Sequence, residues 1–105
     1  MTFRYGEIKE YVTADFERFH KWNFDEDQMY PAVLDEYQHA KDFSRTENIC
    51  IHVILALNYA KHEWDCTYII DKLKMLMSDE IENELKTDLG NEYINFYKDI
   101  SGFLS

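Results

Sequence analysis

The sequence predicts an all-α fold, a compact bundle of five or six helices around a central apolar helix at about residues 47–61. Three observations support this prediction. The 105 residues include only three glycines and one proline, too few breakers for a turn-rich β-fold. Apolar residues recur in steps of three and four along most of the chain. One stretch, residues 49–60, is apolar nearly all round, which is typical of a helix buried on every side.

The first part of the chain predicts two amphipathic helices. In the first, residues three and four apart define one apolar face: Tyr5, Ile8, Val12, Phe16 and Phe19. The acidic run at residues 25–27 interrupts this pattern as a loop or a helix start. Pro31 is expected in the first turn of the second helix, where a missing N–H costs little. The residues of that helix expected to face inward are Val33, Leu34 and Tyr37.

The central helix is expected to begin at a capping box, in which Ser44 is followed three residues later by Glu47. A buried β-strand is the competing interpretation of the apolar run after it, because isoleucine and valine are frequent there. Its length, about 14 residues without a turn signal, favours the helix.

The last part of the chain predicts two or three further helices. A fourth helix carries an apolar stripe of Tyr68, Ile69, Leu73, Leu76 and Met77. Ser78 and Asp79 kink or restart it, and a second stripe follows at Ile81, Leu85 and Leu89. Gly90 suits a helix C-terminal cap in the left-handed conformation. Asn91 is then expected to cap the last helix.

The composition is that of a single all-helical domain covering residues 1–105. Hydrophobic residues make up 46% and aromatic residues 16%, enough for one core despite the charge. The longest apolar run is too short for a membrane span, and the N-terminus lacks the apolar core of a secretory signal. We therefore expect a cytoplasmic protein whose two cysteines, Cys50 and Cys66, are reduced.

Acidity is the most informative property of the composition. The chain carries 21 Asp and Glu against 11 Lys and Arg, and its formal net charge is −10. Such a charge favours a basic protein partner, and direct nucleic-acid binding is disfavoured because no basic patch is visible. Two acidic clusters are candidates for partner binding: Asp79, Glu80, Glu82, Glu84, Asp88 and Glu92, and Asp25, Glu26 and Asp27. A solvated helix face is the alternative, and for any single acid it is the better interpretation.

Two tryptophans complete the candidate binding residues. Trp22 and Trp64 both lie among charged residues near expected helix ends. Each either closes the edge of the core or anchors an interface, a role in which tryptophan is over-represented.

The sequence predicts no catalytic residue, no metal site and no cofactor. It contains no phosphate-cradling glycine loop and no local nucleophile motif. His62 and Cys66 are four residues apart and would share a helix face as two zinc ligands; the favoured alternative is a polar turn whose cysteine faces the core. His52 lies within the apolar run, where a backbone or tyrosine partner is expected rather than a role as catalytic base.

Residues 30–104 resemble the small all-helical immunity proteins of bacterial polymorphic-toxin systems. The similar elements are YPAVLDEYQHAKDF, the apolar NICIHVILALNYAKHEW and the acidic DKLKMLMSDEIENELKTDL. The likeness lies in helix order, spacing and the central apolar helix, and no site residue is carried over from it. The resemblance implies a cytoplasmic inhibitor that binds a cognate toxin, often a basic nuclease, and blocks it stoichiometrically.

We therefore expect a non-enzymatic toxin inhibitor whose association with a basic partner is salt-sensitive. Reversal of Glu80, Glu84 and Asp88 to lysine is expected to slow association and leave the fold intact. One alternative is a phage- or plasmid-encoded acidic inhibitor that mimics nucleic acid. The other is a small helical enzyme or metal protein built around His62 and Cys66. Nothing in the sequence sets the oligomeric state.

Overall fold

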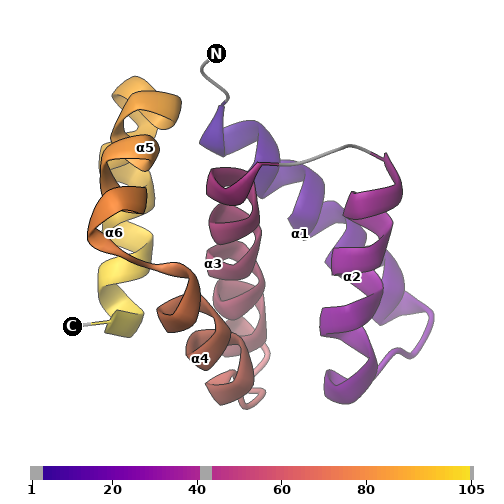
Figure 1. Ribbon diagram of the computed structural model, residues 1–105. Coiled ribbons are helices and arrows are strands. Elements are labelled where there is room, and N and C mark those ends of the chain that lie inside the picture. Colours follow the sequence, from indigo (N-terminus) through magenta and orange to yellow (C-terminus); the bar gives the residue numbers. More distant parts are fainter. Residues whose placement is uncertain (1–3, 41–43, 105) are drawn as a thin grey trace.

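The computed structural model describes residues 4–40 and 44–104, and every regular element within them is helical. The elements are α1 (Tyr5–Lys21), α2 (Glu26–Ala40), α3 (Arg45–Lys61), α4 (Thr67–Leu76), α5 (Asp79–Leu89), the 3₁₀ turn η1 (Gly90–Glu92) and α6 (Tyr93–Leu104). In Figure 1, α3 lies in the middle, with α2 on one side and α4, α5 and α6 on the other. The all-α prediction is confirmed.

Helix α3 forms the centre of the core. Its N-cap is Ser44, whose Oγ accepts a hydrogen bond from the Glu47 backbone N–H at 3.2 Å, as the capping box predicts. Every residue from Ile49 to Ala56 is buried. Helices α1, α2, α4, α5 and α6 all contact α3. The central apolar helix was therefore predicted correctly, and the β-strand alternative was wrong.

Helix α2 begins in the acidic run at residues 25–27, which confirms the helix-start interpretation of that run; the prediction that Pro31 lies in the first turn was wrong. Asp25 caps the N-terminus of this helix, because its Oδ1 accepts hydrogen bonds from the backbone N–H groups of Asp27 and Gln28, both at 3.0 Å. The Gln28 side chain accepts in return from the Asp25 N–H at 3.1 Å. This is a capping box with Asp and Gln in its two positions. Pro31 is consequently inside the helix, where it removes one helical hydrogen bond instead of none.

The C-terminal helices follow the predicted breaks, with one difference. Ser78 restarts the chain, because its Oγ accepts from the Ile81 N–H at 3.3 Å and caps α5. Gly90 ends α5 at φ 55° and ψ −125°. The positive φ was expected, but this ψ belongs to a type II′ turn rather than to the left-handed helix. The chain therefore enters η1 directly, and this turn replaces the predicted Asn91 cap.

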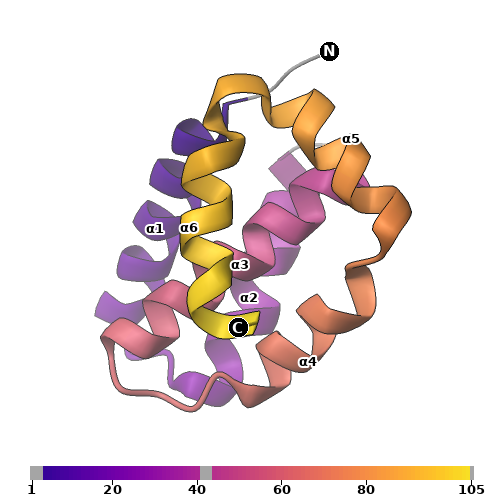
Figure 2. The same ribbon diagram turned by 90° about the vertical axis from the view of Figure 1, so that its left-hand side faces the viewer.

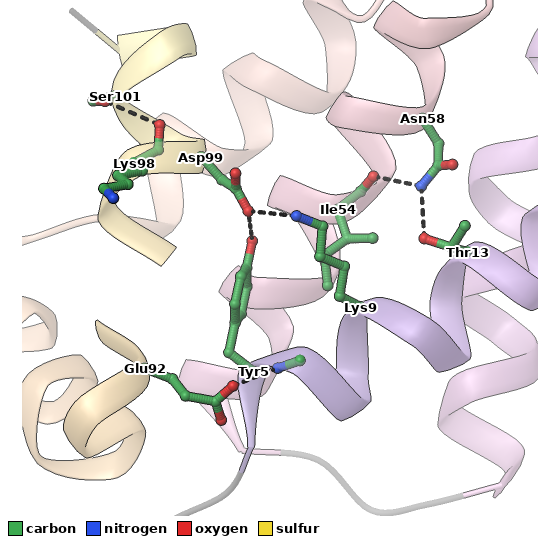
Figure 3. A network of polar contacts seen from close by, with 10 residues as sticks. Tyr5, Lys9, Thr13, Ile54, Asn58, Glu92, Lys98, Asp99 and Ser101 are labelled. Carbon is green, nitrogen blue, oxygen red and sulfur yellow. Dashed lines mark hydrogen bonds and ion pairs between the residues drawn. The ribbon is translucent and has the colours of Figure 1, made fainter. Parts of the chain in front are cut away.

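Helix α6 is attached to the N-terminal helix by polar contacts. Figure 2 shows the two helices running alongside each other. The Asp99 Oδ2 atom of α6 accepts a hydrogen bond from the Tyr5 hydroxyl at 2.6 Å and forms an ion pair with the Lys9 ammonium at 3.0 Å, as Figure 3 shows. These contacts join the two ends of the described chain into one helical unit.

Candidate partner-binding surface

The acids of the C-terminal cluster do not form one open surface. The Asp88 carboxylate accepts a hydrogen bond from the Thr46 hydroxyl at 2.8 Å, and Thr46 is only 1% exposed. The Glu92 carboxylate accepts from the Gly6 backbone N–H at 3.0 Å (Figure 3). Asp88 therefore connects α5 to α3, and Glu92 connects η1 to α1. Both acids have a structural role.

Two further acids of this cluster have partners within the chain. Glu84 forms an ion pair with Arg45 at 2.5 Å. Glu82 accepts from the Tyr93 hydroxyl at 3.3 Å and lies 3.8 Å from the Lys86 ammonium. In the described part of the chain, only Asp79 and Glu80 of the six are exposed carboxylates without a partner.

These contacts correct one expectation from the sequence. Reversal of Glu80, Glu84 and Asp88 to lysine is instead expected to destabilise the fold, because it would place one lysine against Arg45 and another against the buried Thr46 hydroxyl. The sequence pattern places acids along one helix, but it does not reveal which of them face a neighbouring helix.

The second predicted cluster also divides by role. Asp25 is the capping residue of α2. A Glu26 carboxylate oxygen accepts from the Asp65 backbone N–H at 3.3 Å and so links the start of α2 to the loop before α4. Asp27 is exposed, and its carboxylate accepts no hydrogen bond from the residues that the structure describes. Asp27 is therefore available to a partner.

Glu26 and Asp27 lie at the edge of a groove of about 690 Å³ between α2 and α4. Tyr59 of α3, the helix between those two, also lines it. Asp65 contributes a third carboxylate, and Lys72 contributes the one ammonium group among the lining residues. The apolar lining includes Tyr30, Pro31, Leu34, Tyr68 and Ile69. Acidic and aromatic groups are therefore combined in one concave site.

A buried histidine holds one wall of the groove in place. Nδ1 of His52 donates to the Asn48 carbonyl at 2.8 Å, so Nε2 is left to accept a hydrogen bond from the Tyr30 hydroxyl. Burial lowers the pKa of His52 and raises that of Tyr30 to about 12, which keeps both groups neutral near pH 7. The backbone and tyrosine partners predicted for His52 are confirmed.

The fixed Tyr30 ring supports a second, more exposed tyrosine. Tyr68 of α4 packs against Tyr30 edge to face, with ring centroids 5.5 Å apart, and is 64% exposed. The Lys72 ammonium lies 5.7 Å from the centre of the Tyr68 ring. Tyr68 therefore presents an aromatic face at the groove on which a cation already lies.

Asp65 is held in its charged form. Its carboxylate accepts from the backbone N–H and the hydroxyl of Thr67 at 3.0 and 2.6 Å, and these bonds lower the pKa of Asp65. Sequence reasoning missed Asp65, Tyr30 and Tyr68 as candidate site residues. The Asp-x-Thr spacing at residues 65–67 signals a local turn, but no sequence pattern pairs α2 with α4.

The two tryptophans have different surroundings. Trp64 is half-buried, with its ring 5.7 Å from that of Phe16 and 5.3 Å from that of Tyr59, and so closes the edge of the core. Trp22 is 61% exposed at the end of α1, with the Arg18 guanidinium 5.7 Å from its ring. Trp22 has the exposure that an interface anchor requires, and its role in binding stays a prediction.

His62 and Cys66 do not share a helix face. Both lie in the connection between α3 and α4, where Glu63 turns the chain at φ 60°. The His62 ring stacks on Phe16 at 5.3 Å and lies 4.5 Å from the His20 ring, while Cys66 packs half-buried against the core. Both cysteines are free thiols. Within residues 4–40 and 44–104, no three His, Cys, Asp or Glu side chains gather as metal ligands.

Comparison of the chain with protein-family models, with curated proteins and with solved structures gives no match. Among the helices described here, none has the length and apolar character needed to cross a bilayer.

Proposed function

We propose that this chain is a cytoplasmic immunity protein that binds a basic protein toxin and neutralises it stoichiometrically. The observation that carries the proposal is the groove between α2 and α4, whose lining includes the carboxylates of Glu26, Asp27 and Asp65, the Lys72 ammonium and the exposed Tyr68. The formal charge of −10 adds a long-range attraction to the same partner. The family resemblance of residues 30–104 supports the same function.

The net charge and the tyrosines of the groove affect different steps of binding. The net charge raises the rate of encounter with a cationic protein, because the attraction acts before contact. The tyrosines supply a rigid apolar contact area, of the kind that carries most of the binding energy at protein interfaces. An inhibitor of this kind needs no catalytic group of its own, since blocking the toxin's active site is sufficient.

Growth rescue tests the proposal. The reading frame next to this chain's gene is expressed in a bacterial host from one inducible plasmid, and this chain from a second. We expect the neighbouring product to arrest growth and this chain to restore it. A neighbouring product that is harmless, or an arrest that this chain does not relieve, would contradict the proposal.

A charge-reversal variant connects the rescue to the acids. Asp27, Asp79 and Glu80 are exposed and have no partner in the described part of the chain, so their reversal to lysine leaves the internal contacts in place. We expect this triple variant to keep its far-ultraviolet circular dichroism spectrum and to lose protection. Full protection by the folded triple variant would count against binding through these charges.

A further inference from the structure

The groove between α2 and α4 combines the three properties that favour recognition of a guanidinium group. It is concave, at about 690 Å³, which is within the size range of ligand pockets. Its carboxylates, from Glu26, Asp27 and Asp65, outnumber its one ammonium, from Lys72. Its aromatic groups include Tyr30 and the 64% exposed Tyr68.

We propose that this groove binds an arginine side chain of the protein partner. The proposal rests on the function proposed above and names the chemical group that the binding site recognises. A guanidinium is planar and weakly hydrated, so it stacks on an aromatic face, and its fork of N–H donors pairs with a carboxylate through two hydrogen bonds. A lysine ammonium is a strongly hydrated point charge and gains less from the same walls.

Lys72 indicates where the incoming cation binds. Its ammonium lies 5.7 Å from the centre of the Tyr68 ring, so this ring already interacts with a positive charge from the same chain. An arginine that enters the groove competes with Lys72 for that ring, and the Lys72 charge repels it. Removal of the Lys72 charge is therefore expected to tighten binding, whereas loss of a structural residue would weaken it.

The remaining groups prepare the site for a cation. The Asp27 carboxylate accepts no hydrogen bond from the described residues and keeps its full capacity to accept. The two bonds from Thr67 keep Asp65 ionised. The bond to the buried His52 fixes the Tyr30 ring, against whose edge Tyr68 packs. The Asp65 carboxylate and the Tyr30 ring are therefore held in place before binding, which favours affinity.

Titration with capped tripeptides, followed by two-dimensional nuclear magnetic resonance on the isotope-labelled full chain, tests the proposal. The probes are acetyl-Gly-Arg-Gly-amide and its citrulline and lysine counterparts; citrulline replaces the guanidinium with a neutral group of the same shape. We expect saturable shifts at α2 and α4 with the arginine peptide, weaker shifts with lysine, and none with citrulline. Equal shifts with citrulline, tighter binding of lysine, or no shift at all would overturn the proposal.

Variants identify the groove as the site of these shifts. Asp27→Asn and Tyr68→Ala are each expected to weaken arginine-peptide binding by about two- to fivefold, and Lys72→Met to strengthen it by a similar factor. Glu10→Gln is the matched control: it removes one negative charge from an exposed acid of α1 that does not line the groove, and it is expected to bind as the unchanged chain does. Weaker binding by Lys72→Met, or an equal loss in the control, would overturn the assignment.

The peptide titration and the growth rescue test different statements, so a negative result in one does not imply a negative result in the other. Arginine-specific shifts at the groove support this site even where the neighbouring gene product is harmless. Growth rescue that is unchanged by Tyr68→Ala would overturn the role of the groove and leave the proposed neutralisation intact.

Discussion

Asp88 distinguishes an acid that supports the fold from acids that are available to a partner. Its carboxylate accepts a hydrogen bond from the Thr46 hydroxyl at 2.8 Å, and Thr46 is 1% exposed. A hydrogen bond to a charged group contributes about 1.5–3 kcal/mol. The Ser44 hydroxyl, 2.9 Å from that of Thr46, remains as a second partner, and alanine has the better helix propensity. Asp88→Ala is therefore expected to lower the free energy of unfolding by about 1–2 kcal/mol.

Urea unfolding monitored by circular dichroism measures this loss. The midpoint is expected to fall by roughly 1 M without a change in slope, because the slope of small proteins is about 1–3 kcal/mol per M. Asp71→Ala is the matched control, since Asp71 is an exposed acid of α4. Its expected change is within about 0.5 kcal/mol. Equal midpoints for Asp88→Ala and the unchanged chain, or an equal loss in the control, would refute the structural role of Asp88.

Three further predictions concern the core and its polar groups. Leu73→Ala is expected to cost about 2–5 kcal/mol in the same urea assay, because Leu73 is fully buried; a smaller loss would show that α4 packs loosely on α3. Asp15 is 6% exposed, burial raises its pKa, and one of its carboxylate oxygens has no hydrogen-bond partner, while the other pairs with Arg18 at 3.0 Å. Asp15→Ala is expected to raise the melting temperature, because it removes the buried carboxylate and leaves Arg18 its second ion pair, with Glu36; a lower melting temperature would contradict this. Because burial lowers the pKa of His52, the unfolded chain binds more protons than the folded chain below about pH 6.5. The free energy of unfolding therefore falls as the pH falls, by at most about 1.4 kcal/mol per pH unit. His52→Gln is expected to flatten this pH dependence, and an unchanged slope would show that His52 is not responsible.

The sequence predicted those parts of the fold whose causes are local. Helix α3 follows from its apolar composition and from the Ser44 cap, which acts within three residues. Ser78 restarts the chain in the same local way. For the start of α2, the sequence left the acidic run at residues 25–27 open as a loop or a helix start, and the capping box of Asp25 and Gln28 makes it the helix start. The placing of Pro31 in the first turn was wrong. Pro31 is tolerated in the helix at the cost of one hydrogen bond.

The candidate site depends on contacts between distant parts of the chain, and a sequence pattern does not contain them. Glu26 and Asp65, 39 residues apart, meet at one edge of the groove. Thr46 and Asp88 are 42 residues apart, and the hydrogen bond between them gives Asp88 a structural role. Helical spacing predicts which residues share a face, but the packing of the helices decides whether that face meets solvent or a neighbour.

If charge drives binding, the association rate depends on the salt concentration. Stopped-flow mixing of this chain with the purified product of the neighbouring gene gives that rate at about 50 and 500 mM NaCl, where the screening length falls from about 14 to 4 Å. We expect a stable complex whose association slows at least about tenfold at the higher salt concentration. No complex, or an association rate that does not change with salt, would refute charge-driven binding of this partner.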